Sequence, residues 1–256
     1  MKEQIDLSGD VALVTGAAGG IGSAVAEELA KEGATTVVTD VSVEEGTAVA
    51  ADLDESYDAT VVFRQLDVSD YDACETVIGE VVEEFGSIDV LVNVAAGGLR
   101  DHGSLKPFYE TTPDDWQIQF DVTFRGPVNT THAAIQHMME QESGAIVNFI
   151  SEAHKGQERG DDKLYASSKG GVAVFTKALS REIGEFGIRI NGISPAATHT
   201  PATTELIEKH GDRMLKNYAL NRLGQPEDSA YMAVFLASDA ADWVTGQVIS
   251  VNGGYS

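Results

Sequence analysis

The chain contains one cysteine in 256 residues. Cys74 therefore cannot form a disulfide within the chain, and nothing in the composition points to an oxidising compartment. It lies in a stretch with helical periodicity and has apolar neighbours, which favours a packed thiol over a nucleophile. Histidines and carboxylates also lack the spacing of a zinc site, so we expect no metal.

Basic residues are scarce as well. The chain has 17 lysines and arginines against 41 aspartates and glutamates, giving a formal net charge of -24 at pH 7. A surface of this sign repels the phosphates of nucleic acids and anionic membranes, so we expect neither as a partner. The acidity favours a salt-rich cell interior, where a Debye length of about 3 Å at 1 M screens self-repulsion. An ordinary acidic surface that aids solubility is the alternative.

Long apolar runs and linkers are absent too. No stretch approaches the roughly 18 apolar residues of a membrane span, and residues 1–9 are charged and polar, unlike a signal sequence. We therefore expect a soluble, cytoplasmic protein. No repeat, low-complexity tract or linker divides the chain, so its 27.2 kDa are expected to form a single domain over residues 1–256.

The sequence does contain a regular alternation of short β-branched runs with helical periodicity. Seven strands are predicted, over residues 11–15, 35–39, 60–66, 89–94, 145–150, 188–193 and 247–251. Helix-length segments separate them, such as residues 71–85, where apolar side chains recur every three or four positions. This order predicts an α/β fold, a doubly wound parallel sheet with helices on both faces. Residues 97–112 and 194–214 are less regular and should lie at the carboxyl edge of the sheet.

A glycine-rich turn directly follows the first predicted strand. Residues 15–22 read Thr-Gly-Ala-Ala-Gly-Gly-Ile-Gly, and a helical pattern follows over residues 23–31. Gly16, Gly20 and Gly22 allow positive φ angles and a close backbone approach, so amide groups and the helix N-terminus can meet a pyrophosphate. A tight turn without a ligand is the alternative, which the position after the first strand disfavours.

Asp40 ends the second predicted strand, 18 residues beyond Gly22. At this spacing a carboxylate reaches the adenosine ribose and accepts hydrogen bonds from its hydroxyls. A 2′-phosphate there would meet a like charge, at a cost on the order of 4 kcal/mol for unit charges about 4 Å apart. No arginine or lysine at positions 17, 18, 41 or 42 offsets this cost, so NAD is expected rather than NADP. Capping of the next helix is a second, compatible role for Asp40.

Tyr165 and Lys169 stand four residues apart at the start of a strongly helical segment, so they share one helix face. The reference pKa of tyrosine is about 10, and a pKa near 7 requires roughly 4 kcal/mol of preferential stabilisation of the phenolate. A neighbouring ammonium and a cationic nicotinamide supply such stabilisation. Taken alone, such a pair is usually a surface pair, so the case for chemistry depends on the other motifs.

These motifs occur in one order: the glycine turn, the acidic residue, a serine that ends the fifth strand (Ser151), and the tyrosine–lysine pair. In this arrangement the chain resembles the short-chain dehydrogenase/reductase family. Asp67-Val68 looks like the family's adenine-side pair, residues 191–195 like the stretch after its sixth strand, and residues 245–254 like its C-terminal signature. The resemblance covers essentially the whole chain and implies a single-domain Rossmann fold and a homotetramer.

The resemblance also implies a role for each matching residue. Tyr165 acts as general acid/base, Lys169 holds the nicotinamide ribose and lowers the tyrosine pKa, and Ser151 hydrogen-bonds the substrate oxygen. A hydride then moves between a small-molecule secondary alcohol, or its ketone, and the nicotinamide. The cofactor contacts implied in this way are Gly16, Gly20, Ile21, Gly22, Asp40, Asp67, Val68, Asn93, Ala95, Tyr165, Lys169, Ile193, Pro195 and Thr200.

The chain departs from the family pattern at three places. Asn93-Val94 replaces a double asparagine after the fourth strand, so a slightly rebuilt cofactor floor is expected. Thr123 stands where the family has a catalytic asparagine associated with a proton-relay water. Since Thr123 keeps a backbone carbonyl and a hydroxyl, we expect a modified relay. Ala196 replaces the usual glycine after Pro195, which restricts φ and alters the loop.

Three segments are expected to bound the substrate pocket, residues 97–102, 152–163 and 201–218. Their Arg100, His102, His154 and His210 suit a polar or anionic substrate, although each is also typical of an exposed loop. Two other functional classes are open. A non-catalytic nucleotide-sensing module has no need of the serine, tyrosine and lysine together, and an NAD-using epimerase or dehydratase usually carries a longer substrate domain.

Overall fold

The strands form one seven-stranded parallel sheet. The computed structural model describes residues 5–97, 107–156 and 163–255. The strands are β1 (Val11–Thr15), β2 (Thr35–Asp40), β3 (Val61–Gln65), β4 (Val90–Asn93), β5 (Gly144–Phe149), β6 (Ile188–Pro195) and β7 (Val248–Val251). Their order in the sheet is β3-β2-β1-β4-β5-β6-β7, and every neighbouring pair is parallel. The seven predicted strands and their parallel arrangement are confirmed.

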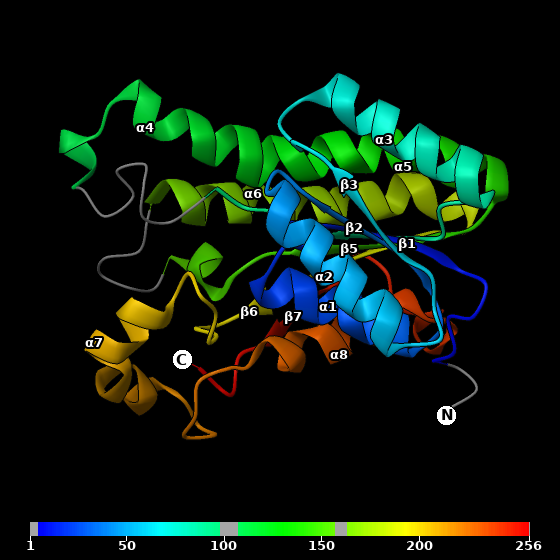
Figure 1. Ribbon diagram of the computed structural model, residues 1–256. Helices are drawn as coiled ribbons and strands as arrows, with labels where there is room; N and C mark the ends of the chain where they lie inside the picture. The colour runs from blue at the N-terminus through cyan, green and yellow to red at the C-terminus, as the bar shows by residue number, and fades with distance from the viewer. Residues whose placement is uncertain (1–4, 98–106, 157–162, 256) are drawn as a thin grey trace.

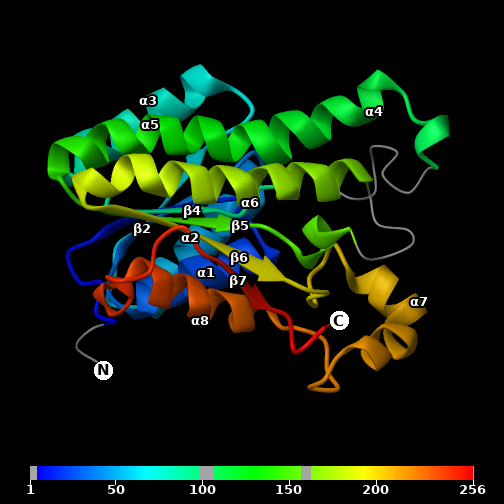
Figure 2. The same ribbon diagram turned by 180° about the vertical axis from the view of Figure 1, so that it is seen from behind.

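Helices cover both faces of this sheet. They are α1 (Gly20–Lys31), α2 (Val43–Ser56), α3 (Tyr71–Phe85), α4 (Pro113–Ile118), α5 (Gly126–Gln141), α6 (Lys163–Ile183), α7 (Thr204–Met214) and α8 (Pro226–Ala237). Figures 1 and 2 show α1, α2 and α8 on one face and α3, α5 and α6 on the other. In the part of the chain that the structure describes, no helix is long and apolar enough to cross a membrane.

The first strand shows why the predicted strands are apolar on both sides. Ala12 and Val14 belong to the core under α1 and α8, whereas Val11 and Leu13 belong to the core under α3 and α5. Successive side chains of a strand point to opposite faces, so a strand between two helical layers needs apolar residues at every position. Burial of each large apolar side chain contributes about 1.5–3 kcal/mol. Helices on both faces of the sheet provide this burial.

Cys74 lies in the second of these cores. Its side chain is fully buried on α3, and its thiol is free and donates to the carbonyl oxygen of Val68 at 3.6 Å. Burial raises the pKa of this thiol to about 12, which keeps it protonated at neutral pH. The predicted packed thiol is confirmed.

Two helical segments differ from the sequence interpretation. Helices α4 and α5 are joined by a π-helical stretch, Gln119–Arg125, which the sequence pattern did not indicate. Ser168 of α6 donates to the backbone carbonyl oxygen of Gln119 at 3.1 Å, and such an inserted side chain widens the helix at that turn. The less regular stretch 194–214 contains α7, an amphipathic helix with no fully buried residue.

Candidate active site

The predicted functional residues gather at the carboxyl edge of the sheet, where β1 and β4 lie side by side. The chain order runs outward in opposite directions from this pair, which is the topological switch point at which open α/β sheets bind ligands. A cavity of about 730 Å³ opens there. The predicted residues that line it are Ile21, Ser151, Tyr165, Lys169, Pro195 and Thr200.

The glycine turn is held closed by contacts that leave no room for side chains. Gly16 has φ 66°, and a Cβ on it would lie 2.7 Å from the Cα of Ala95. A Cβ on Gly22 would overlap the carbonyl oxygen of Gly16. Gly20, with φ 61°, begins α1. The predicted need for glycine thus has a direct cause, and Ala95 contributes by packing its backbone against the turn.

The N-terminus of α1 is suited to an anion that the protein does not itself supply. Gly19, the N-cap residue, makes no side-chain hydrogen bond to the first N–H groups of the helix, and no acidic residue lies in the first turn. By contrast, α3 is capped by Asp70, whose carboxylate accepts from the backbone N–H groups of Asp72 and Ala73. Free N–H groups and the positive end of the helix dipole favour a phosphate at α1. These residues fit the pyrophosphate of a nicotinamide dinucleotide.

Asp40 joins the glycine turn to the start of α2. Its Oδ2 accepts from the backbone N–H of Ala18 at 3.1 Å, and its Oδ1 accepts from that of Ser42 at 3.0 Å. Since α2 begins at Val43, the second bond orders the residue before the helix. The carboxylate stands beside the turn, where a dinucleotide's adenosine ribose would lie, and it also orders the entry to the next helix. Both predicted roles are compatible with this geometry.

Asp67 and Val68 form a turn directly after β3. Asp67 is exposed, and its Oδ1 accepts from the backbone N–H and the hydroxyl of Ser69. Val68 is buried, and its carbonyl oxygen accepts from Asn129 of α5 at 2.9 Å. The pair is fixed against α5, and its contact with the adenine stays a prediction.

Asn93 is the last residue of β4 and belongs to a buried hydrogen-bond network. Its amide donates to Asn148 of β5 at 2.9 Å and accepts from Thr130 of α5 at 2.7 Å. The backbone N–H groups of Val94 and Ala95 donate to the hydroxyl oxygen of Thr15 in β1, at 3.2 and 3.3 Å. Strands β1, β4 and β5 are tied together in this way although the second asparagine of the family pattern is missing. Ile193 of β6 is buried in the core under α1 and α8.

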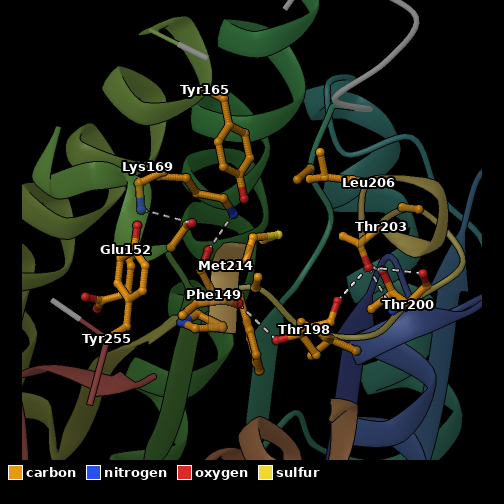
Figure 3. A pocket seen from close by; sticks show the side chains of 18 of the residues that line it. Phe149, Glu152, Tyr165, Lys169, Thr198, Thr200, Thr203, Leu206, Met214 and Tyr255 are labelled. Carbon is orange, nitrogen blue, oxygen red and sulfur yellow. Dashed lines mark hydrogen bonds between the residues drawn. The ribbon is translucent and has the colours of Figure 1, made fainter. Parts of the chain in front are cut away.

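Tyr165 and Lys169 project from the first turns of α6. Lys169 is 1 % exposed, its Nζ donates to the carbonyl oxygen of Phe149 at 2.5 Å, and it lies 5.8 Å from the centroid of the Tyr165 ring. Figure 3 shows the phenol hydroxyl and the lysine nitrogen pointing toward one another at the cavity. Burial lowers the pKa of Lys169 to about 7. Its charge, and the stabilisation that it gives a phenolate, is therefore sensitive to pH near neutrality.

Ser151 faces the same cavity from the end of β5. It is the N-cap of a short 3₁₀ helix, Glu152–Lys155, and its Oγ accepts from the backbone N–H of Ala153 at 3.2 Å. This bond uses a lone pair of the oxygen, so the hydroxyl proton can be donated to a substrate oxygen. His154 Nδ1 donates to the Ser151 carbonyl oxygen at 2.7 Å.

Thr123 lies in the π-helical stretch and is fully buried. Its hydroxyl donates to Gln119 Oε1 at 3.1 Å and accepts from the backbone N–H of Gly97 at 3.0 Å. The bond from Gly97 ties the π-helical stretch to the segment after β4, and Thr123 is not among the residues that line the cavity. Thr123 is thus buried away from the residues that line the cavity, and its part in a proton relay stays a prediction.

Several residues of the cavity were not singled out from the sequence. Glu152 is a buried carboxylate, and Tyr218 and Tyr255 pair with their ring centroids 5.1 Å apart. A charged residue immediately after a buried strand was the available signal for Glu152. Helix α7 contributes Leu206, Lys209, His210 and Met214 to the wall. Of the four predicted polar residues, His210 lines the cavity, His154 is not among its lining residues, and Arg100 and His102 lie outside the described residues.

Burial and hydrogen bonds act on Glu152 in opposite directions. Burial raises the pKa of the carboxyl group, but hydrogen bonds from Lys155, Ser250, Ser194 and Asn252 outweigh it and hold the pKa below its ordinary value. Glu152 is therefore ionised at neutral pH, next to the serine that faces the cavity.

Known proteins are similar to this chain in both sequence and architecture. The family model described as Enoyl-(Acyl carrier protein) reductase matches residues 16–256. The 3-oxoacyl-[acyl-carrier-protein] reductase FabG of Thermotoga maritima is 38 % identical over 248 residues, which cover 97 % of this chain and 98 % of that protein. The (2S)-[(R)-hydroxy(phenyl)methyl]succinyl-CoA dehydrogenase subunit BbsD of Thauera aromatica is 36 % identical, with 96 % of each chain covered.

A solved structure extends the similarity to the fold. A gluconate 5-dehydrogenase from Burkholderia cenocepacia, in complex with NADP and tartrate, has a TM-score of 0.90 and 32 % identity, covering 99 % of this chain and 97 % of its own. Fold, motif order and relatives agree. The chain belongs to the short-chain dehydrogenase/reductase family, oxidoreductases that act on CH–OH and keto groups.

Proposed function

We propose that this protein is an NAD-dependent oxidoreductase that transfers a hydride between a secondary alcohol, or its ketone, and the nicotinamide. The observation that carries the proposal is the convergence of Tyr165, Lys169 and Ser151 on one cavity beside the uncapped N-terminus of α1. Each group is an ordinary feature of a fold when it occurs alone. Together they supply a proton acceptor, a cation and a hydrogen-bond donor around one reacting oxygen.

The three side chains divide the work at that oxygen. In the oxidising direction, the Tyr165 phenolate takes the proton of the substrate hydroxyl, while the Ser151 hydroxyl donates a hydrogen bond to the same oxygen. A nicotinamide cofactor, when bound, would supply the acceptor for the hydride of the adjoining carbon. Protonated Lys169 stabilises the phenolate by its charge and is held in place by the carbonyl oxygen of Phe149. In the reducing direction, Tyr165 returns the proton to the carbonyl oxygen.

Asp40 supports NAD over NADP. Its carboxylate stands beside the glycine turn, and no lysine or arginine occupies positions 17, 18, 41 or 42 to receive a 2′-phosphate. A like charge at about 4 Å costs on the order of 4 kcal/mol at an effective dielectric constant near 20. The structure of the gluconate 5-dehydrogenase relative contains NADP. The cofactor preference of this protein is therefore tested with both NAD and NADP.

Assembly belongs to the same proposal. Val174 on α6, Tyr231 on α8 and Trp243 after α8 are exposed large apolar residues. Such side chains are typical of an interface between subunits. They support the homotetramer that the family resemblance implies.

A substrate screen combined with Tyr165→Phe tests the proposed function. Reduction of NAD or NADP by secondary alcohols and gluconate, and oxidation of NADH or NADPH by ketones and a 3-oxoacyl thioester, are followed at 340 nm. We expect turnover with NAD, and a fall in kcat of at least about a thousandfold in Tyr165→Phe, because the ring stays and the proton acceptor is lost.

Nicotinamide fluorescence supplies the control. NADH should bind to Tyr165→Phe within about threefold of the wild-type Kd, since the phenol oxygen is a small part of the cofactor's contacts. Turnover that survives the substitution would show that Tyr165 is not the acid/base. Cofactor binding without turnover on any substrate would favour the nucleotide-sensing alternative.

A further inference from the structure

Glu152 is a buried charge directly beside the serine of the active site. It is 5 % exposed and lies in the short 3₁₀ helix that Ser151 caps. Removing a carboxylate from water costs several kcal/mol unless hydrogen bonds replace the water. The assigned reaction roles of Ser151, Tyr165 and Lys169 do not use Glu152, so its burial needs another explanation.

Donors from its own 3₁₀ helix and from one distant segment replace that water. Lys155 Nζ and Asn252 Nδ2 donate to Glu152 Oε2 at 2.6 and 3.1 Å, and Ser250 Oγ donates to Oε1 at 2.7 Å. Lys155 also donates to Ser250 at 3.2 Å. The ionised carboxylate is an acceptor only, so it can accept from Lys155, Asn252 and Ser250 at the same time. It thereby joins the segment after β5 to β7 and the turn that follows, about a hundred residues away in the chain.

The second of these segments forms a wall of the cavity. Asn252 Oδ1 accepts from the backbone N–H of Gly254 at 3.0 Å, and Asn252 Nδ2 donates to the carbonyl oxygen of Tyr255 at 3.3 Å. The Tyr255 ring packs on that of Tyr218, and both rings line the cavity. Figure 3 shows Glu152 and Tyr255 next to one another at the same side of the pocket. The position of the aromatic wall therefore depends on Asn252, and Asn252 is bound to Glu152.

We propose that Glu152 is a positioning residue that holds Ser151 and the Tyr255 wall in fixed relation, so that a substrate packed on the wall presents its oxygen to the serine. The proposal rests on the proposed function, because it assigns Ser151 to the substrate oxygen. The proposed role of Glu152 differs from a general contribution to stability in one respect. Loss of the carboxylate changes the handling of the substrate and leaves the cofactor, on the other side of the site, bound as before.

Glu152→Gln is the direct test, and the chain offers a matched control. The substitution keeps the shape but places an NH₂ donor among the donors Lys155, Asn252 and Ser250. Glu28 on α1 shares the burial and the local lysine of Glu152 but does not line the cavity: it is 7 % exposed and accepts from Lys31, three residues on, at 2.6 Å. We expect kcat/KM for the substrate to fall at least tenfold in Glu152→Gln and less than twofold in Glu28→Gln. The Kd of NADH should stay within twofold in both.

Equal kcat/KM in Glu152→Gln and Glu28→Gln would overturn the proposal, and so would a loss explained by an increased Kd of NADH. If Glu152→Gln does not fold, Ser250→Ala removes one donor and should lower kcat/KM in the same direction with unchanged NADH binding; an unchanged kcat/KM there overturns the proposal.

Hydrogen–deuterium exchange separates this proposal from the proposed function. In Glu152→Gln, amides of residues 151–156 and 250–255 should exchange at least tenfold faster, while those of residues 11–31 stay unchanged. This outcome supports the link even if no substrate in the screen is turned over, which would then count against the proposed function alone. Unchanged exchange in both segments would overturn the link whatever the activity.

Discussion

The cofactor region (residues 11–40) and the substrate region (residues 149–156, 195–218 and 250–255) are built in different ways. In the cofactor region, backbone geometry makes the site: Gly16 and Gly22 allow close packing, and α1 presents uncapped N–H groups. In the substrate region, side chains from distant segments make it, such as Glu152 with Asn252. A site made by backbone depends on a short stretch of sequence, whereas a site made by side chains depends on the whole fold.

The two regions also tolerate substitution differently. A Cβ on Gly22 has no space because the atom it would meet is backbone, which cannot rotate away. In α7, which lines the substrate region, no residue is fully buried. Helix α7 can therefore exchange side chains at little cost in stability, which permits one scaffold to serve different substrates.

The largest effect is expected from Gly22→Ala, with Gly19→Ala as its matched control. The added Cβ at position 22 overlaps the Gly16 carbonyl oxygen and forces the turn open. A Cβ at position 19 meets nothing within 4 Å, and φ there is 174°, an extended backbone that any residue adopts. We expect NADH affinity to fall at least about a hundredfold and the melting temperature to drop in Gly22→Ala.

Gly19→Ala should keep its free energy of unfolding within about 1 kcal/mol of the wild type. NADH titration by fluorescence and thermal unfolding measure both variants. Similar behaviour of the two would mean that the closed turn is not what holds the cofactor, and the contrast between backbone-built and side-chain-built regions would lose its main support.

This contrast also explains what could be predicted from sequence. The strands were found because burial on both faces requires apolar runs, and α3 was found to the residue because its pattern and its cap at Asp70 are local. The glycine turn and the Tyr165/Lys169 pair are local as well. Their meeting at one cavity follows from the parallel order of the sheet, since all strands end at the same edge.

The residues that sequence reasoning missed depend on contacts between distant segments. The π-helical stretch around Thr123 is accompanied by a bond from Ser168, 49 residues from its partner. The burial of Glu152 depends on Ser250 and Asn252, 98 and 100 residues away. No periodicity within a single helix or strand carries such information, because the partners are chosen by the tertiary fold.

Lys169 lies where the two regions meet, and its burial predicts a second effect. Its pKa is about 7 in the folded protein against 10.5 for an ordinary lysine. Between these values the unfolded chain binds the extra proton, so folding stability rises with pH, by up to about 1.4 kcal/mol per pH unit. The penalty of the buried charge is fully present below pH 7 and is lost as the pH approaches 10.5.

Lys169→Met lacks this titration. Urea unfolding of both proteins without cofactor, at pH 6, 8 and 9.5, measures this effect. The free energy of unfolding of the wild type should increase relative to that of the variant as the pH rises. Curves that stay parallel over this range would show that Lys169 keeps its proton in the folded state, which would leave the phenolate stabilised throughout neutral pH.

The smallest effect is expected from Asp40→Ala. This substitution tests the charge of the cofactor region, whereas Gly22→Ala tests its shape. The substitution removes the negative charge that disfavours a 2′-phosphate but adds no cation to bind one. It also removes the acceptor for the N–H groups of Ala18 and Ser42, so affinity for NAD falls modestly. We expect the ratio of kcat/KM for NAD to that for NADP to drop roughly tenfold to a hundredfold, within the cost of about 4 kcal/mol for a close like-charge pair.

Asp40→Asn separates the two contributions, because an amide oxygen still accepts a backbone N–H while the charge is gone. If charge sets the preference, Asp40→Asn lowers the ratio as much as Asp40→Ala does and retains tighter NAD binding. A wild-type protein that prefers NADP would contradict the argument from charge, and would mean that a cation from elsewhere in the fold reaches the ribose. The cofactor region would then depend on side chains from distant segments, as the substrate region does.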